Sequence, residues 1–211
     1  MLDELAAQAS GLPGLGLRWF TTDSERAALG ALMIDAAAAI VNDRRQSIDS
    51  FAWFRASEDA IETHRDGLTV WVQDLPALVT SAAMLLPASS RPAGDKFWLT
   101  QTRTVHTKTA AAYGVITVRD PSSARARLLG GRMLERIHLA ATSHGLALQH
   151  MNQITERIDR QASLGAAPTF AGRFTALLAT PGRAPLVSFR IGYPARAARL
   201  SPRRPVAWVT Q

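Results

Sequence analysis

One segment in the middle of the chain is bounded by a strong helix start and a strong helix stop. Asp120, Pro121 and the two serines that follow form the start, because short polar side chains accept hydrogen bonds from the first backbone N–H groups of a helix. Gly145 forms the stop, because glycine readily adopts the left-handed conformation that ends helices. The spacing predicts one long helix with a charged side, formed by Arg125, Arg132, Glu135 and Arg136, and an apolar side, formed by Met133, Leu134, Ile137 and Ala141.

Two residues of this predicted helix indicate what packs against it. Gly130 lies in the middle of the apolar side, where glycine costs about 1 kcal/mol relative to alanine. This glycine predicts that another backbone packs close to the helix. Leu139 lies on the charged side, and a buried subunit interface would explain it.

Apolar periodicity predicts more helices than strands along the rest of the chain. The ranges with helical spacing are 2–9, 29–41 behind the capping candidates Thr22, Asp23 and Ser24, 48–55, 154–164 and 170–178. The ranges with the alternation typical of strands are 96–106, 111–118 and 185–193. Turns or loops are predicted at 11–16, 66–68, 146–153 and 201–206. A majority of helices with a few strands indicates an α+β fold.

Composition narrows the class of protein. The 211 residues fit one ordinary domain, and 47% hydrophobic against 19% charged residues exclude a disordered chain. Because there is no cysteine, a disulfide scaffold, an iron–sulfur cluster and thiol catalysis are excluded. The uncharged apolar range 75–90 is too short to span a membrane, and two prolines interrupt it. The acidic N-terminus lacks the basic region of a secretion signal, so the chain as given is predicted to be cytoplasmic, and export of a longer parent chain is left open.

Arginine dominates the positive charge. The formal net charge is +7, and all basic residues other than Lys96 and Lys108 are arginines, whose guanidinium groups suit bidentate contacts with phosphate. A GC-rich genome produces the same arginine-rich and alanine-rich composition. The basic residues are scattered rather than grouped into a stripe, which argues against nucleic-acid binding.

The usual catalytic motifs are missing. No pair of the five histidines has the spacing of a metal site, so the sequence predicts no metal centre. Neither a GxSxG motif, nor a P-loop, nor a GxGxxG motif after a strand occurs, which argues against most hydrolases and leaves the catalytic residues unknown.

Two polar groups remain as candidate binding residues. Arg203 and Arg204 stand between two prolines, and this stiff backbone would present two guanidinium groups to a phosphate. The alternative is a solvent-facing basic tail. Gln149, Asn152 and Gln153 follow the long helix, and their amides can pair with the edge of a heteroaromatic ring. The alternative is ordinary loop capping.

Two stretches of the sequence resemble the flavin-dependent nitroreductase superfamily. The letters GRMLERIHLAA at 131–141, followed by Gly145-Leu146, are similar to the long core helix of that family. The letters LVSFRIGYP at 186–194, followed by RRPV at 203–206, are similar to its closing strand and C-terminal signature. Upstream, Trp53, Arg55 and 66–68 resemble a divergent branch with two fused nitroreductase-like halves, and the chain resembles the C-terminal half. The resemblance treats 1–211 as a single domain, with a good match over 113–211 and a loose match over 1–112.

This resemblance implies a fold, a cofactor and a set of residues. The fold would be a central, mostly antiparallel sheet flanked by helices, in a dimer with FMN at the interface. Carried over to this sequence, Arg203 and Arg204 would bind the flavin phosphate, and Met151, Asn152 and Gln153 would meet the edge of the flavin ring. NAD(P)H would act as reductant and a nitro or quinone-like small aromatic compound as acceptor.

One segment departs from the family pattern. The family's N-terminal phosphate-binding element is a basic, RxSxRxF-like segment, and residues 45–51 have its spacing. Asp49 stands where the second arginine would be, which reverses the charge beside a phosphate. The main hypothesis is an FMN-dependent NAD(P)H oxidoreductase that acts as a homodimer or together with a missing N-terminal half. The alternative is a non-catalytic flavin-fold protein that sequesters flavin or acts as a dimerisation half.

Overall fold

The computed structural model describes residues 1–55, 57–73, 90–196 and 200–210. The chain divides into two compact units. The first unit comprises 1–40 and 99–194, and the second comprises 41–98 and 195–211. The apolar range 75–90 falls almost wholly outside the described residues. Within the described ranges, no helix is both long enough and apolar enough to cross a membrane.

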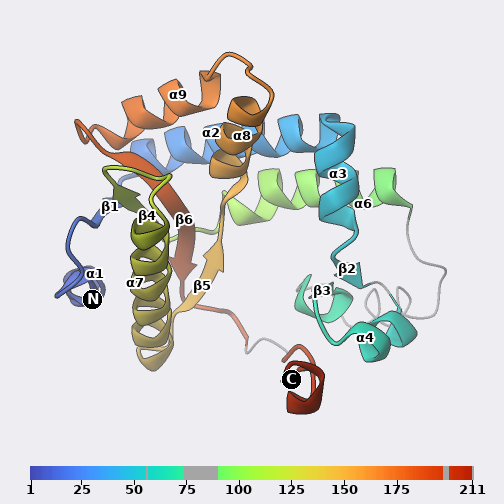
Figure 1. Cartoon of the computed structure of the whole chain (residues 1–211). Helices are drawn as coiled ribbons and strands as arrows, with labels where there is room; N and C mark the ends of the chain where they lie inside the picture. The colour runs from blue at the N-terminus through green and yellow to red at the C-terminus, as the bar shows by residue number, and fades with distance from the viewer. Residues whose placement is uncertain (56, 74–89, 197–199, 211) are drawn as a thin grey trace. The chain divides into compact units, whose positions relative to one another are not determined.

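A four-stranded antiparallel sheet forms the centre of the first unit (Figure 1). Its strands, in spatial order, are β1 (Gly16–Phe20), β4 (Ala112–Val118), β6 (Ala184–Gly192) and β5 (Ala147–His150). Every residue of β4 is buried, because β4 has a strand on each side and helices on both faces. This sheet confirms the predicted α+β fold, and β4 and β6 confirm the strands predicted at 111–118 and 185–193.

The helix α7 (Ala124–Ser143) covers one face of the sheet, next to the short helix α1 (Leu2–Ala6). Ser123 caps α7, since its hydroxyl accepts a 3.3 Å hydrogen bond from the Ala126 N–H, and Gly145 follows the helix with a φ of +72°. The predicted start and stop are therefore confirmed. The apolar side of α7 packs on the sheet through Met133, Ile137, Ala141, Ile116, Phe189 and Ile191.

Gly130 makes the close contact that the sequence predicts, but the neighbour is different. A Cβ at Gly130 would lie 2.2 Å from Cδ2 of Leu186 on β6. The prediction of a close backbone is therefore corrected, because a leucine side chain of the sheet fills the space above this glycine.

Three helices cover the opposite face of the sheet. They are α2 (Asp23–Asn42), α8 (Gln153–Ser163) and α9 (Thr169–Leu178), as predicted for these parts of the chain. The core on this side contains Phe20, Leu29, Met33, Tyr113, Met151, Ile154 and Phe174.

The strand predicted at 96–106 is wrong. These residues continue the helix α6 (Arg91–Gln101) and then form a π-helical turn, Thr102–His106. The alternating threonines imitate a strand, but a threonine hydroxyl can bond back to the preceding helical turn, as the Thr104 hydroxyl does to the Thr100 carbonyl at 2.9 Å. Conversely, β1 and β5 form in ranges predicted as loop or left without an element, because both are edge strands whose residues are largely part-exposed or exposed.

The second unit consists of short elements. They are α3 (Arg44–Phe51), β2 (Phe54–Arg55), α4 (Glu58–His64), β3 (Leu68–Thr69), a 3-10 turn at Val70–Gln73, most of α6, and a 3-10 turn at Val206–Trp208. Asp43 starts α3 earlier than predicted, because its carboxylate accepts hydrogen bonds from the backbone N–H groups of Arg45 and Gln46. Strand β2 pairs in parallel with β3, so the helix predicted at 48–55 ends at Phe51.

Candidate functional site

The turn between β5 and α8 holds the three residues predicted to meet a flavin ring. Met151 is buried in the core, and both of its backbone groups are bonded to Ser188 of β6, with a 2.8 Å distance from the Met151 nitrogen to the Ser188 oxygen. Asn152 accepts a 3.0 Å hydrogen bond from the Ser188 N–H through its side-chain oxygen. Both backbone groups of Met151 are therefore occupied, whereas the side-chain NH₂ of Asn152 has no partner among the described residues.

Gln153 differs from its two neighbours. It is the first residue of α8 and is only 5% exposed. Within the part of the chain that the structure describes, its side-chain amide has no hydrogen-bond partner. The amide atoms of Gln153 are not among the buried side-chain atoms that lack a partner in the described ranges, so they keep some contact with solvent and stay available to a ligand. Gln153 is therefore the predicted ring-edge residue that is best prepared to bind a ligand.

Beside this turn, one row of cross-strand partners runs over all four strands of the sheet, and its side chains change from apolar on β1 to polar on β5. Phe20, Tyr113, Arg190 and Gln149 are successive cross-strand partners on β1, β4, β6 and β5. Arg190 donates to the Gln149 side-chain oxygen at 2.6 Å, to the Thr109 hydroxyl at 2.7 Å and to the His106 carbonyl at 3.1 Å. Burial lowers the pKa of Arg190 from its ordinary value. The row ends in a fixed guanidinium group at the β5–β6 edge.

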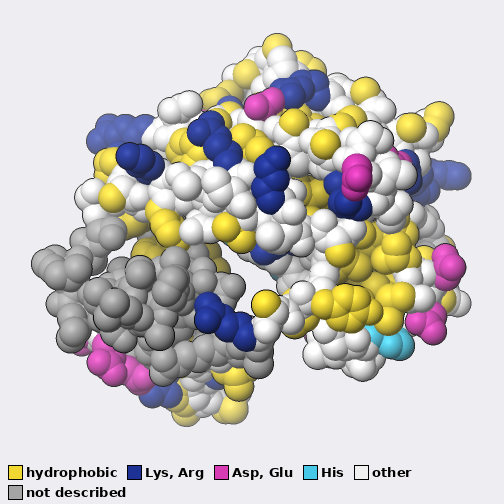
Figure 2. All heavy atoms as spheres, turned by 180° about the vertical axis from the view of Figure 1, so that it is seen from behind, with side chains coloured by type: hydrophobic (Ala, Val, Ile, Leu, Met, Phe, Trp, Pro, Cys, Tyr) yellow, Lys and Arg dark blue, Asp and Glu magenta, His cyan; other side chains and the backbone are white. Residues whose placement is uncertain are grey.

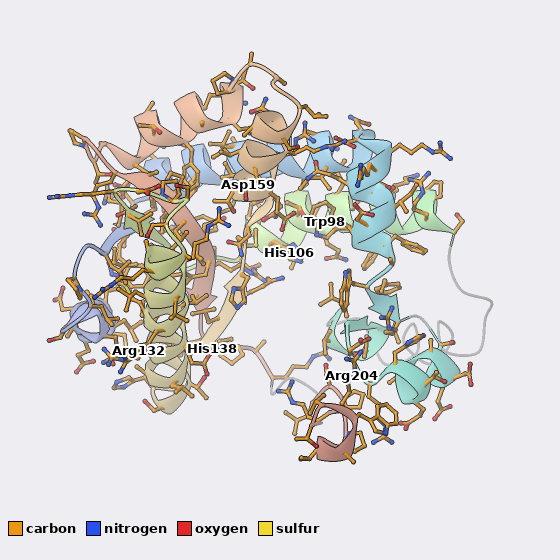
Figure 3. The ribbon with its side chains drawn as sticks, viewed as in Figure 1. Trp98, His106, Arg132, His138, Asp159 and Arg204 are labelled. Atoms are coloured by element: carbon orange, nitrogen blue, oxygen red, sulfur yellow. The ribbon has the colours of Figure 1, made fainter. Side chains whose placement is uncertain are left out.

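The sequence predicted neither Arg190 nor His106 as a site residue. The available signal was weak, namely an arginine inside the otherwise apolar alternation of Val187, Phe189 and Ile191. His106, labelled in Figure 3, is the last residue of the π-helical turn. Burial, with the charge of Arg190 as a second cause, lowers its pKa from 6.5 to about 4. The imidazole is therefore neutral at neutral pH.

The lowered pKa of His106 predicts a loss of stability in acid. Between pH 6.5 and about 4 the unfolded chain binds a proton at this histidine and the folded chain does not, so stability falls as the pH falls through this range. We expect His106→Gln to reduce the dependence of the melting temperature on pH in that window. His64→Gln, at an exposed position, is the control. An unchanged pH dependence in His106→Gln would contradict the prediction.

The two predicted phosphate-binding arginines lie in the second unit and differ in their contacts. Arg203 is exposed and forms no hydrogen bond or ion pair within the described ranges. Arg204 donates to the carboxylate of Asp66 and, at 3.1 Å, to the carbonyl of His64. The same carboxylate accepts from Arg55 at 2.7 and 3.0 Å. Arg204 is therefore already paired with a carboxylate, which it shares with Arg55.

The candidate residues fit FMN in part. The unpartnered amide of Gln153 fits the edge of a flavin ring, which offers both hydrogen-bond donors and acceptors. Arg203 is free to meet a phosphate, whereas Arg204 would first have to leave Asp66. Of the described residues, no group of three metal-binding side chains comes together. Figure 2 shows Lys and Arg side chains spread over the visible face rather than gathered in one patch.

No family model matches the chain, and no curated protein matches it either. Solved structures do match. The FMN- and NADPH-dependent nitroreductase NfnB from Sphigopyxis sp. strain HMH aligns with a TM-score of 0.57 at 16% identity, over 100% of this chain and 87% of that one. The FMN-dependent nitroreductase NfnB from Mycobacterium smegmatis, in complex with NADPH, aligns with a TM-score of 0.53 at 15% identity, over 100% and 86%.

A third solved structure extends the likeness. The nitroreductase with bound FMN from Bacteroides fragilis aligns with a TM-score of 0.50 at 12% identity, over 100% of this chain and 84% of that one. At these identities the likeness shows a shared fold. The assignment to a branch with fused halves stays a prediction.

Proposed function

We propose that this chain, which has the nitroreductase fold, is an FMN-dependent NAD(P)H oxidoreductase of nitroreductase type. The observation that carries the proposal is the alignment of the whole chain with solved structures of FMN-dependent nitroreductases. The side-chain amide of Gln153 on α8 supports it, because this group has no hydrogen-bond partner among the described residues and is available to a polar ligand.

The residues of the chain would contribute binding rather than chemistry. In the first unit, Gln153 and the free NH₂ of Asn152 would orient the ring edge. In the second unit, Arg203 would bind phosphate, and Arg204 would join it once released from Asp66. FMN, when bound, supplies hydride transfer from NAD(P)H to a nitro or quinone-like aromatic acceptor. The proposal includes a homodimer and assigns no catalytic side chain.

The first test measures flavin retention. We expect the purified chain, mixed with FMN and passed through gel filtration, to keep the visible absorption of the flavin. Gln153→Ala should weaken FMN binding about tenfold, the usual value of one hydrogen bond. Gln8→Ala, on a partly exposed glutamine of the N-terminal turn Ala7–Ala9, is the matched control. A chain that never retains FMN would contradict the proposed enzyme.

The phosphate candidates have their own variant. Arg203→Ala combined with Arg204→Ala should weaken FMN binding by about tenfold or more, since hydrogen bonds to charged groups exceed neutral ones. The control is Arg119→Ala combined with Arg125→Ala, which removes the same charge from two exposed arginines. Equal FMN binding in both double variants would exclude Arg203 and Arg204 as phosphate ligands.

A second function is favoured by the ion pair between Arg204 and Asp66. If Asp66 holds this arginine permanently, the chain would be a non-catalytic flavin-fold protein that sequesters flavin or acts as a dimerisation half. Flavin retention without NADPH oxidation in the presence of a quinone would favour sequestration. Absence of flavin binding with intact self-association would favour the dimerisation half.

A further inference from the structure

The guanidinium group of Arg190 carries a positive charge that no carboxylate balances within the described ranges. Arg173 of the same unit, by contrast, forms an ion pair with Asp35. The hydrogen bonds of Arg190 go to neutral groups only, namely the Gln149 side chain, the Thr109 hydroxyl and the His106 carbonyl. A partly buried cation without a counter-ion is costly, and a bound anion would remove this cost.

Three groups at this place keep polar atoms without a partner in the part of the chain that the structure describes. Arg190 donates through Nε and Nη1, so the two hydrogens on Nη2 are left. Gln149 accepts through Oε1, which leaves its NH₂ group, and the imidazole of His106 forms no hydrogen bond in the same ranges. None of these atoms is among the fully buried polar atoms that lack a partner, so they keep contact with solvent.

The three groups lie at the β5 edge of the sheet, on the face opposite α7. Arg190 shares this face with its cross-strand partner Tyr113, which belongs to the core under α2, α8 and α9. Gln149 is the partner of Arg190 on β5 and is exposed, and His106 is labelled in Figure 3. Strand β5 ends at His150 and leads directly into the turn before Gln153. The three groups therefore adjoin the residues proposed to meet the flavin ring.

The charge of these groups matches a carboxylate. Arg190 contributes one positive charge, and burial keeps His106 neutral at neutral pH. A carboxylate carries one negative charge and accepts hydrogen bonds through two oxygens, which Nη2 of Arg190 and the NH₂ of Gln149 can satisfy. A phosphate monoester carries nearly two negative charges, so one of them would stay unbalanced beside a single arginine.

We propose that Arg190, Gln149 and His106 form a site for the carboxylate of the acceptor, so that the acceptor is an aromatic carboxylate. The proposal rests on the proposed function and narrows its substrate class. Arg190 would bind the carboxylate by a charge-assisted hydrogen bond, and Gln149 and His106 would complete the site as neutral donors. A ligand of this size held mainly by one charged contact should bind with a dissociation constant on the order of millimolar.

Titration of the flavin-free chain tests the site without any enzyme activity. Benzoate should shift the side-chain NH₂ signal of Gln149 in ¹⁵N NMR spectra, whereas benzamide, which has the same shape without the charge, should bind at least tenfold more weakly. Arg190→Gln should weaken benzoate binding about ten- to hundredfold. Arg132→Gln, at an exposed arginine of α7 on the other face of the sheet, is the control and should bind benzoate like the wild type.

A second variant covers the case in which Arg190→Gln fails to fold. Gln149→Glu changes an exposed residue of the edge strand and keeps an oxygen for the Nε of Arg190. The new carboxylate should pair with the arginine and occupy the site, so benzoate binding should fall at least tenfold while the melting temperature stays the same or rises. Gln8→Glu, the same change in the turn Ala7–Ala9, is the control.

The FMN-loaded chain tests the substrate class. In Gln149→Glu the KM for 4-nitrobenzoate should rise at least tenfold, whereas the KM for uncharged nitrobenzene should stay within about twofold of the wild-type value. A purely structural role of Arg190 would change both KM values together. Equal KM values for the two compounds in the wild type would overturn the substrate class.

The remaining results separate this site from the proposed function. Benzoate that fails to bind at about ten times the expected constant would overturn the site, and so would unchanged benzoate binding in Gln149→Glu. Tenfold tighter binding of phenyl phosphate than of benzoate would overturn the assignment to a carboxylate. A tenfold loss of FMN retention in Gln149→Glu would place Arg190 at the flavin and overturn the acceptor site. Benzoate binding as expected without any FMN retention would support the site while contradicting the enzyme.

Discussion

Replacing Phe189 by alanine should lower the free energy of unfolding of the first unit by about 3–5 kcal/mol. Phe189 is fully buried on β6 between the sheet and α7. Its ring meets Trp19 of β1 edge to face, with ring centroids 5.6 Å apart and planes at 87°. Denaturant unfolding measures the loss. Tyr193→Ala, which removes an exposed aromatic side chain two residues beyond the end of the buried pattern, should change stability little.

A glycine makes the contact between these two rings possible. Trp19, Gly114 and Phe189 are cross-strand partners on β1, β4 and β6, so the rings of the outer two strands meet over the glycine of the middle one. A Cβ at Gly114 would lie 2.2 Å from Cζ of Phe189. Gly114→Val should therefore displace the ring and destabilise the unit by about 1–3 kcal/mol or more.

The two changes should not be additive. In the Phe189→Ala background, valine at 114 enters space that the ring has left, so Gly114→Val should cost less there than in the wild type. Unfolding of the two single variants and the double variant gives this coupling directly. Additive effects would mean that the ring and the glycine do not share one space.

The central parts of the fold could be predicted from sequence because their patterns are local. Helix α7 has a capping serine, a stop glycine and one apolar side, and β4 is a short apolar run between turns. The edge strands β1 and β5 are only partly buried, so neither shows a strong alternation. At 96–106 the alternating threonines predicted a strand, but their hydroxyls can bond to the preceding helical turn, and the segment is helical.

The candidate site was less accessible to sequence reasoning because it depends on tertiary contacts. Arg190 joins two segments that are far apart along the chain, one with His106 and Thr109 and the other with Gln149, and these segments show no common motif. The motif at 151–153 was visible, but its residues differ in burial and in bonding, and Met151 belongs to the core. Likewise, the sequence indicated Arg204 as a candidate phosphate ligand, but it could not show that Arg204 forms an ion pair with Asp66.

Replacing Asp66 by asparagine should release the C-terminal segment within the second unit. The Asp66 carboxylate holds Arg55 through one oxygen and Arg204 through the other, and its side chain is only 19% exposed. Hydrogen bonds from Arg55, partly offset by burial, hold the pKa of Asp66 below its ordinary value of 3.8. We call the contacts of Asp66 with Arg55 and Arg204 the clasp. The stability that the clasp contributes is therefore fully present above pH 3.8 and is lost as the pH falls below 3.8 toward the folded-state pKa.

Limited proteolysis measures this release. Trypsin should cut the bond between Arg203 and Arg204 about tenfold faster in Asp66→Asn than in the wild type, because a charge-assisted hydrogen bond to Arg204 is lost. Arg204→Lys leaves Arg203, after which trypsin cuts, unchanged and keeps a positive charge at 204. It loses the hydrogen bond to His64, so its cutting rate should fall between those of the wild type and Asp66→Asn. Asp49→Asn, at an exposed carboxylate of α3, is the control, and equal cutting rates in Asp66→Asn and Asp49→Asn would contradict the clasp.

The variant Asp66→Asn also tests whether Arg204 binds the flavin phosphate. A carboxylate and a phosphate bind a guanidinium group with the same geometry, so Asp66 and the flavin phosphate would compete for Arg204. Under the proposed function, Asp66→Asn removes the competitor and should raise FMN retention while it speeds cutting by trypsin. Faster cutting with unchanged FMN retention would make Arg204 a structural residue of the second unit. Arg203 would then be the remaining candidate for phosphate binding, and this result would favour the non-catalytic alternative.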